Sequence, residues 1–303
     1  AQAGVVITAS HNPKEYNGYK VYGPDGGQIP PKAANEILDE INEIKDIKEI
    51  KIMNIEEAAA SGLLESIGEE IDSEYINHIK ELSTVSSIDS EIVRSLKIVF
   101  TPLHGTGNKL VRRILKEVGF ENVTVVTEQE MPDPDFSTVK SPNPEEKEAF
   151  DIALKIAKKI DADIIIGTDP DCDRLGLVTK NPEGKYIILT GNQLGCLMLE
   201  YILSRKSMTG ELRKGYYAVK TIVTTEMARE ITSSFGVELI DVLTGFKFIG
   251  EKIKELESDK NREFLFGFEE SYGYLAGTFV RDKDGVIASM LAAEVAAFYK
   301  SKG

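Results

Sequence analysis

The sequence predicts an α/β fold made of consecutive layered units, and three observations support this prediction. Strand patterns alternate with helical patterns along most of the chain, which is typical of layered α/β proteins. One run, Asp163-Ile164-Ile165-Ile166, is continuously apolar, as strands buried on both faces of a parallel sheet are. The chain has 303 residues, too many for one ordinary core, so two or three domains are expected.

The first unit is predicted to span residues 1–88. It opens on a strand at 4–8 and continues into helices at 32–47 and 69–82. Apolar residues recur every three or four positions in both helices, which predicts one buried stripe on each. The stripe residues are Ile37, Leu38, Ile41, Ile44 and Ile47 in the first helix, and Ile71, Tyr75, Ile79 and Leu82 in the second. The polar run 83–87 reads as a linker.

The second unit is predicted at 89–189 and the third at 190–303. In the second, strands at 97–100, 123–127 and 163–166 alternate with helices at 108–118 and 145–159. Gly119 suits the left-handed position that ends a helix, and the Pro- and Asp-rich run 128–144 reads as a long loop. In the third, strands at 217–222, 237–241 and 264–268 alternate with helices at 191–204, 247–256 and 285–300.

Composition and charge exclude several functional classes. No apolar run approaches the roughly 18–20 residues of a membrane span, so no membrane role is expected. The net charge of −14 argues against nucleic acid as a partner, because phosphate backbones are bound by basic surfaces. The two cysteines form no CxxC pair, which indicates a reducing, cytoplasmic setting. Because the chain opens at Ala1 directly on a strand, we expect that its natural front has been removed.

The strongest chemical signal is the run Gly167-Thr168-Asp169-Pro170-Asp171-Cys172-Asp173-Arg174, directly after a buried strand. Side chains two apart point the same way in an extended loop, so Asp169, Asp171 and Asp173 can converge. Converging carboxylates repel one another unless a hard cation lies between them. The alternative is a solvated acidic turn. A calcium loop is excluded because its Gly and Glu positions hold Arg174 and Lys180. Magnesium fits better.

Two further motifs follow predicted strands. Thr8-Ala9-Ser10-His11-Asn12-Pro13 reads as a tight exposed loop, and Lys20 follows ten residues after Ser10. Gly267-Phe268-Glu269-Glu270-Ser271-Tyr272-Gly273 offers carboxylates that could bind sugar hydroxyls. Taken singly, Ser10 and Lys20 could be surface side chains, and the third motif could be a polar turn. The run Thr101–Lys109 lacks the third glycine of a dinucleotide loop and is interpreted as a structural turn.

Together these motifs resemble the α-D-phosphohexomutase family, which includes phosphoglucomutases and phosphomannomutases. The match covers essentially the whole chain, and the motifs stand in the family's order. A fourth motif, Thr244-Gly245-Phe246-Lys247, resembles the loop that helps to set substrate choice. The resemblance implies consecutive three-layer αβα domains with mixed sheets. It also implies an isomerase that moves a phosphoryl group within one sugar, with glucose 1,6-bisphosphate as intermediate and activator.

The resemblance implies a role for each motif residue. Ser10 would carry the phosphoryl group, and its phosphate would join Asp169, Asp171 and Asp173 around Mg²⁺. Lys20 would be the general acid/base, and His11 would lie beside the phosphoserine. The remaining roles are contacts with substrate: Arg174 to phosphate, Glu269 and Ser271 to sugar hydroxyls, and Lys247 to the part of the sugar that sets specificity.

The resemblance also has limits. Family members have a longer first domain and a fourth domain with a Ser-Gly-Thr phosphate loop, and neither is found here. The chain is therefore expected to have little or no mutase activity by itself. The sequence favours glucose 1-phosphate and glucose 6-phosphate as substrates, with mannose or pentose phosphates as alternatives. A haloacid-dehalogenase-type phosphatase is disfavoured, because Ser10 would have no role in it. The remaining alternative is a non-catalytic module that binds sugar phosphate or metal.

Overall fold

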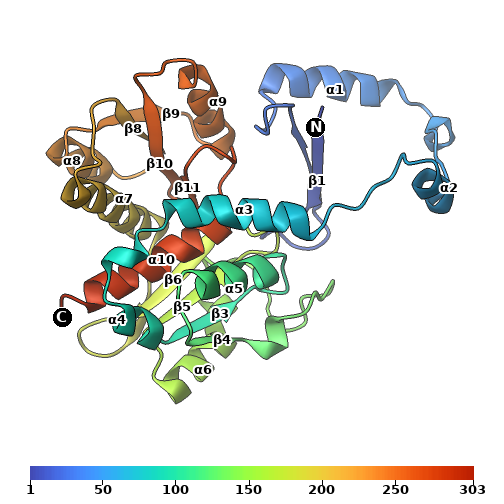
Figure 1. Cartoon of the computed structure of the whole chain (residues 1–303). Coiled ribbons are helices and arrows are strands. Elements are labelled where there is room, and N and C mark those ends of the chain that lie inside the picture. The colour runs from blue at the N-terminus through green and yellow to red at the C-terminus, as the bar shows by residue number, and fades with distance from the viewer.

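Three β-sheets organise the chain in the computed structural model, which describes residues 1–303 (Figure 1). The strands are β1 (Gly4–Thr8), β2 (Gly18–Tyr22), β3 (Ile98–Thr101), β4 (Val123–Val125), β5 (Ile164–Thr168), β6 (Leu175–Lys180), β7 (Tyr186–Ile188), β8 (Tyr216–Thr221), β9 (Glu238–Val242), β10 (Glu263–Glu269) and β11 (Gly273–Ala276). The α-helices are α1 (Pro31–Glu43), α2 (Ile55–Ala60), α3 (Glu69–Leu82), α4 (Ser90–Ser95), α5 (Gly107–Glu117), α6 (Asp151–Ile160), α7 (Gly191–Thr209), α8 (Met227–Ser234), α9 (Phe246–Leu256) and α10 (Gly285–Lys300). No helix is long and apolar enough to span a membrane.

The middle sheet has the order β4-β3-β5-β6-β7. Strands β3, β4 and β5 run parallel, while β6 and β7 pair antiparallel, so the sheet is mixed as expected. All five residues of β5 are buried, because helices cover both faces. Ile165 packs in one apolar cluster with Ala153 and Ala157 of α6, and Ile164 packs in another with residues of α5 and α10. This arrangement confirms a three-layer αβα unit.

The second mixed sheet has the order β11-β10-β8-β9, with β11 antiparallel to β10. Neighbouring residues of β10 point to opposite faces of the sheet. Gly267 lies against Ile249 of α9, and a Cβ there would come within 2.9 Å of Ile249 Cγ2. Phe268 lies against Gly195 of α7, where a Cβ would come within 2.1 Å of the Phe268 ring. Helices therefore cover both faces of this sheet too.

Helix α10 joins the two mixed sheets, and α3 lies alongside it (Figure 1). Most of α10 is buried. Asp284 caps its N-terminus by accepting hydrogen bonds of 2.9 Å from the amides of Val286 and Ile287. The same carboxylate accepts a 2.6 Å hydrogen bond from the hydroxyl of Tyr75 in α3. The cap therefore connects the N-terminal third of the chain to the rest.

The N-terminal elements form no buried core of their own. Strands β1 and β2 make a two-stranded antiparallel hairpin, and α1 has no buried residue. The prediction of one buried stripe over 32–47 is therefore wrong: Leu38, Ile41, Ile44 and Ile47 are exposed, and α1 ends at Glu43 because Ile44 is extended. A two-stranded hairpin offers too little apolar surface to cover such a stripe. In α3, Ile79 is buried and Ile71 is exposed.

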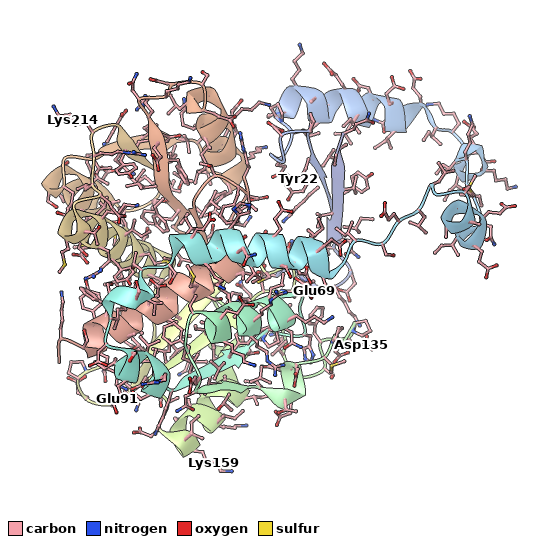
Figure 2. The ribbon with its side chains drawn as sticks, in the orientation of Figure 1. Tyr22, Glu69, Glu91, Asp135, Lys159 and Lys214 are labelled. Atoms are coloured by element: carbon pink, nitrogen blue, oxygen red, sulfur yellow. The ribbon has the colours of Figure 1, made fainter.

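The hairpin faces the other two sheets through polar side chains. Tyr22 of β2 points toward the rest of the chain (Figure 2), and its hydroxyl donates a 2.9 Å hydrogen bond to Asp282. Asp25 forms an ion pair with Lys254 of α9. These contacts hold the hairpin against the segment before α10 and against α9.

Candidate active site

Ser10 lies in a tight turn directly after β1. Its backbone adopts a φ of 51°, in the left-handed region that costs a residue with a Cβ roughly 1–2 kcal/mol. The turn is closed by a 2.7 Å hydrogen bond from the Ser10 amide to Thr8 Oγ1 and by one of 2.9 Å from the Asn12 amide to the Ala9 carbonyl. Such strain is typical of functional loops, because the surrounding structure must hold it.

The three aspartates converge as predicted. Their potential ligand atoms all lie within 4.8 Å of one another. The loop turns sharply at Cys172, whose φ is 57°. Asp169 holds the turn, since its Oδ1 accepts hydrogen bonds from the amides of Asp173 at 3.1 Å and Arg174 at 2.9 Å.

These carboxylates fit a divalent cation. The Oδ1 atoms of Asp171 and Asp173 are buried and have no hydrogen-bond partner in the protein. Buried acceptors without a donor are rare and call for an ion or water. Three carboxylate oxygens with room for a further oxygen ligand suit Mg²⁺.

The structure brings Ser10 to this cluster. Ser10 Oγ donates a 2.8 Å hydrogen bond to Asp169 Oδ2, across 159 positions of sequence. The Nδ1 atom of His11 lies 3.1 Å from the same hydroxyl. Burial lowers the pKa of His11, and the nearby Arg174 lowers it further. His11 is therefore neutral near pH 7 and can exchange a hydrogen bond with the hydroxyl without adding a charge.

Two lysines neutralise the cluster. Lys20 Nζ lies 2.9 Å from Asp173 Oδ2 and 3.2 Å from Asp171 Oδ2. Lys283 Nζ lies 3.0 Å from Asp173 Oδ2. Burial opposes the charge of both ammonium groups, but the carboxylates outweigh burial and raise the pKa of each lysine. Both lysines therefore carry a positive charge at neutral pH.

The pKa values of Asp173 and Asp169 are shifted in opposite directions. Burial would raise the pKa of Asp173, but Lys283 and Lys20 outweigh it and hold that pKa at about 2. Burial raises the pKa of Asp169 well above its usual range, and the charges of Asp173 and Asp171 raise it further. A cation bound among these carboxylates would offset their mutual repulsion.

The predicted sugar-binding loop lies next to the aspartate loop. An isolated bridge pairs Arg174 with Gly273, and the Leu175 amide donates a 3.0 Å hydrogen bond to the Tyr272 carbonyl. Glu269 at the end of β10 is buried, and burial raises its pKa against the opposing charges of Lys283 and Arg174. Ser271 follows two residues later on the same turn, half-buried.

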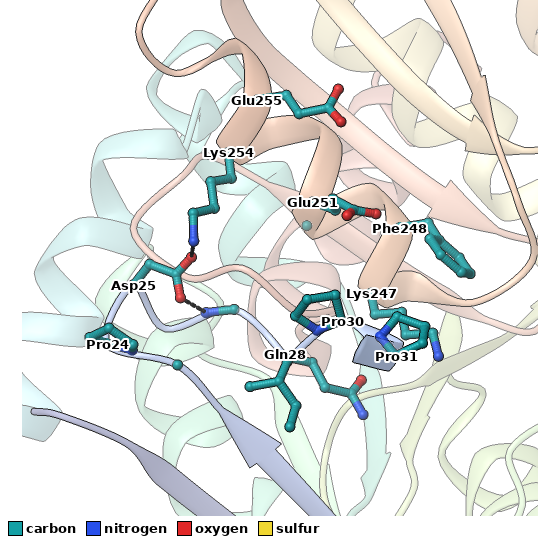
Figure 3. A pocket seen from close by; sticks show the side chains of 14 residues that line it. Pro24, Asp25, Gln28, Pro30, Pro31, Lys247, Phe248, Glu251, Lys254 and Glu255 are labelled. Carbon is teal, nitrogen blue, oxygen red and sulfur yellow. Dashed lines mark hydrogen bonds and ion pairs between the residues drawn. The ribbon is translucent and has the colours of Figure 1, made fainter. Parts of the chain in front are cut away.

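Arg174 and Lys247 occupy different surroundings. Arg174 forms an ion pair with Glu145 while its Nε is buried without a partner. Lys247 lies at the start of α9 and lines a cleft of about 550 Å³ together with Gln28 and Pro31 (Figure 3). Its ammonium lies 5.2 Å from the centre of the Phe248 ring. Arg174 is thus tied to the aspartate loop by its backbone amide, which donates to Asp169, whereas Lys247 lines the cleft between the segment after β2 and α9.

Sequence reasoning missed Lys283. It lies in the run Arg281-Asp282-Lys283-Asp284 before α10, which reads as a solvated charged turn. One available signal was the helix cap: an Asp directly before a predicted helix marks where the chain turns inward. The run Thr101–Lys109 leads from β3 into α5, as predicted, and both ring nitrogens of His104 are engaged, at 2.8 Å by the Met131 carbonyl and at 2.7 Å by Thr138 Oγ1.

Comparison with known proteins gives consistent matches. Sequence models of the α/β/α domains I, II and III of phosphoglucomutase/phosphomannomutase match residues 1–48, 73–184 and 190–302. A phosphoglucomutase of Staphylococcus epidermidis is 40% identical over 304 aligned residues, which cover all of this chain and 53% of that protein. The chain therefore spans about half the length of the curated relatives it matches.

Solved structures show the same fold. A phosphoglucomutase/phosphomannomutase family protein of Burkholderia thailandensis superposes with a TM-score of 0.69 at 22% identity, covering 98% of this chain and 56% of that one. N-acetylphosphoglucosamine mutase of Aspergillus fumigatus, solved with GlcNAc-6P and magnesium, gives a TM-score of 0.58 at 14% identity, covering 98% and 71%. A variant of the latter was solved with glucose 1,6-bisphosphate, with a TM-score of 0.60.

Proposed function

Because the chain belongs to the α-D-phosphohexomutase family, we propose that it supplies the phosphoserine, metal-binding and sugar-binding loops of a phosphoglucomutase. The single observation that carries this proposal is the 2.8 Å hydrogen bond from Ser10 Oγ to Asp169. It places the one strained, accessible hydroxyl of the motif beside three converging carboxylates.

In the proposed reaction Ser10 carries a phosphoryl group to and from the sugar. The bond between phosphorus and Ser10 Oγ breaks as one forms to the free hydroxyl of glucose 1-phosphate or glucose 6-phosphate. The hydroxyl loses its proton, and Ser10 Oγ gains one. The product is glucose 1,6-bisphosphate, which returns its other phosphoryl group to Ser10 by the reverse steps. No phosphate is lost to water, so the enzyme acts as an isomerase.

Magnesium held by Asp169, Asp171 and Asp173 would supply charge neutralisation for the phosphoryl group. Phosphoryl transfer depends mainly on positioning and electrostatic stabilisation. Lys20 and Lys283 are protonated and lie beside these carboxylates, so they can stabilise the transferring group and hand a proton to an oxygen. Lys20 is proposed as the general acid/base, which gives a proton to Ser10 Oγ and receives the proton that the sugar hydroxyl loses. His11, held at 3.1 Å, orients the Ser10 hydroxyl.

The sugar is proposed to bind between the hairpin and the second mixed sheet, which contains β8 to β11. Glu269 and Ser271 would accept and donate hydrogen bonds to sugar hydroxyls, and Arg174 would contact phosphate. Lys247 would contact the far side of the sugar across the cleft that it lines. The name of the Staphylococcus epidermidis relative, phosphoglucomutase, supports glucose phosphates as the substrates proposed here, ahead of mannose or pentose phosphates.

An enzyme-linked assay tests this function in a protein that contains this whole chain. Glucose 1-phosphate is supplied with Mg²⁺ and a trace of glucose 1,6-bisphosphate, and glucose 6-phosphate is measured. We expect Ser10→Ala to lose turnover by at least about a thousandfold, since a covalent carrier cannot be replaced. A non-catalytic module is the second candidate, and it is favoured if unmutated protein that binds Mg²⁺ converts no hexose or pentose phosphate.

A further inference from the structure

A second cavity, of about 350 Å³, shares no lining residue with the candidate active site. It lies between the segment that follows α3, helix α7, and the ends of β10 and β11. Its wall includes Ser83, Thr84, Ser86 and Ser87 from the segment between α3 and α4. The cavity therefore touches the connection between the Ser10 hairpin and the aspartate-bearing sheet.

Arg205 of α7 lines this cavity and lacks a carboxylate partner. The residue is only 6% exposed. Its Nε is buried without any hydrogen bond, and Nη1 reaches only the sulfur of Met208, at 3.4 Å. The guanidinium carbon lies 5.2 Å from the centre of the Phe298 ring. A buried guanidinium without an anion is costly, so buried arginines are nearly always paired.

The carboxylates near Arg205 are engaged elsewhere. Buried Glu294 accepts hydrogen bonds from Ser83, Thr84 and the hydroxyl of Tyr201. Glu211 pairs with Lys206 at 3.7 Å, and Glu263 pairs with Arg213. Glu81 lies 3.5 Å from His78. None of these groups neutralises Arg205.

The cavity carries further groups suited to an anion. The hydroxyls of Ser86, Thr209 and Thr278 line the same space, and Lys206 lines it as well, paired with Glu211. Guanidinium groups bind phosphate through two parallel N–H donors, and hydroxyl groups can donate hydrogen bonds to the remaining phosphate oxygens. A carboxylate would use fewer of these donors than a phosphate.

We propose that this cavity binds the phosphate group of a small phosphorylated metabolite, with Arg205 as its main anchor. The ligand would lie against residues 83–87 and restrain the segment between α3 and α4. The site is separate from the one that holds the transferred phosphoryl group, so this inference does not depend on the proposed mutase function.

Calorimetric titration with inorganic phosphate tests the site on the 303-residue chain. An Arg174→Gln background removes the expected phosphate contact of the candidate active site. In that background we expect Arg205→Met, which keeps the packing on Phe298, to weaken phosphate binding by about tenfold or more. Arg94→Gln removes an exposed arginine of α4 that does not line the cavity, and it should change the affinity by less than about twofold. Equal binding with and without Arg205 would overturn the proposal.

Hydrogen exchange of the unmutated chain gives a second readout that needs no variant. Phosphate should slow amide exchange across residues 83–87, and acetate at the same concentration should not. Unchanged exchange at 83–87 under saturating phosphate would overturn the site. Equal protection by acetate would overturn the choice of phosphate as ligand.

Discussion

Lys283 Nζ and Asp173 Oδ2 lie 3.0 Å apart, although one residue precedes α10 and the other follows β5. Lys20 of β2 reaches the same carboxylate oxygen at 2.9 Å. Three separate segments therefore meet at Asp173, and together they hold its pKa at about 2. The charge balance of the site depends on how the hairpin and the two mixed sheets pack together. No single loop provides both the carboxylates and the lysines.

Replacing Lys283 by Met should lower mutase turnover by about 10²–10³-fold, because it removes one preorganised charge beside the transferring group. Lys283→Arg should retain more activity, since it keeps the charge. The enzyme-linked assay measures both variants. Lys180→Met is the matched control, because Lys180 pairs with Asp161 at the end of the middle sheet opposite the aspartate loop. Turnover of Lys283→Met within twofold of the unmutated protein would contradict a role of the Lys283 charge in phosphoryl transfer.

Replacing Gly105 by Ala should weaken Mg²⁺ binding by roughly tenfold. A Cβ at this position would lie 2.5 Å from Pro170 Cα and 2.6 Å from the Pro170 carbonyl oxygen, inside the aspartate loop. Overpacking of this kind costs typically 1–3 kcal/mol or shifts the backbone. Calorimetric titration with Mg²⁺ measures the change. Gly68→Ala, where the nearest atom is Glu70 Oε2 at 3.6 Å, should leave the affinity unchanged.

Glu294 should make the protein less stable as the pH rises. Burial raises its pKa above the ordinary 4.5, so the folded chain binds more protons than the unfolded chain between 4.5 and the raised value. The free energy of unfolding therefore falls across that range. Glu294→Gln keeps acceptors for Thr84 and Tyr201 and should flatten this slope, as chemical denaturation at several pH values would show. If the free energy of unfolding of the variant fell with pH as steeply as that of the unmutated protein, Glu294 would not be the cause of the fall.

Replacing the fully buried Lys220 by Met should lower the free energy of unfolding by about 1–3 kcal/mol, because the carbonyl groups that its ammonium bonds would lose their buried donor. Its ammonium lies 2.8 Å from Glu226 and 3.0 Å from Asp241, and donates to the carbonyls of Thr221 and Thr224. Lys254→Met removes only an exposed pair and should cost less than about 1 kcal/mol. Equal losses in the two variants would contradict this reading.

Strongly periodic or continuously apolar segments of the fold could be predicted from sequence. The helix predicted at 69–82 matches α3, and that at 285–300 matches α10. The strands β2, β6, β7 and β11 were not predicted. Each is defined by antiparallel pairing with a neighbour rather than by its own pattern. The division of the chain at residues 88 and 189 remains a prediction.

Residues of the candidate site were predictable where a compact motif carried them. The aspartate loop and Ser10 each stand in a recognisable run, and the structure brings both together with Lys20. Lys283 and Tyr22 could not be found this way, because their roles arise only where distant segments meet. The roles of Arg174, Glu269, Ser271 and Lys247 in substrate binding remain proposals.

Phosphopeptide mapping tests the central claim most directly. A protein that contains this whole chain would be incubated with glucose 1,6-bisphosphate and Mg²⁺, digested, and its peptides examined by mass spectrometry. The account predicts one added phosphoryl group on the peptide that contains Ser10, dependent on Mg²⁺ and absent from Ser10→Ala, with Ser61→Ala as an unaffected control. Phosphorylation of another residue, or of none in folded chain that binds Mg²⁺, would contradict Ser10 as the phosphoryl carrier.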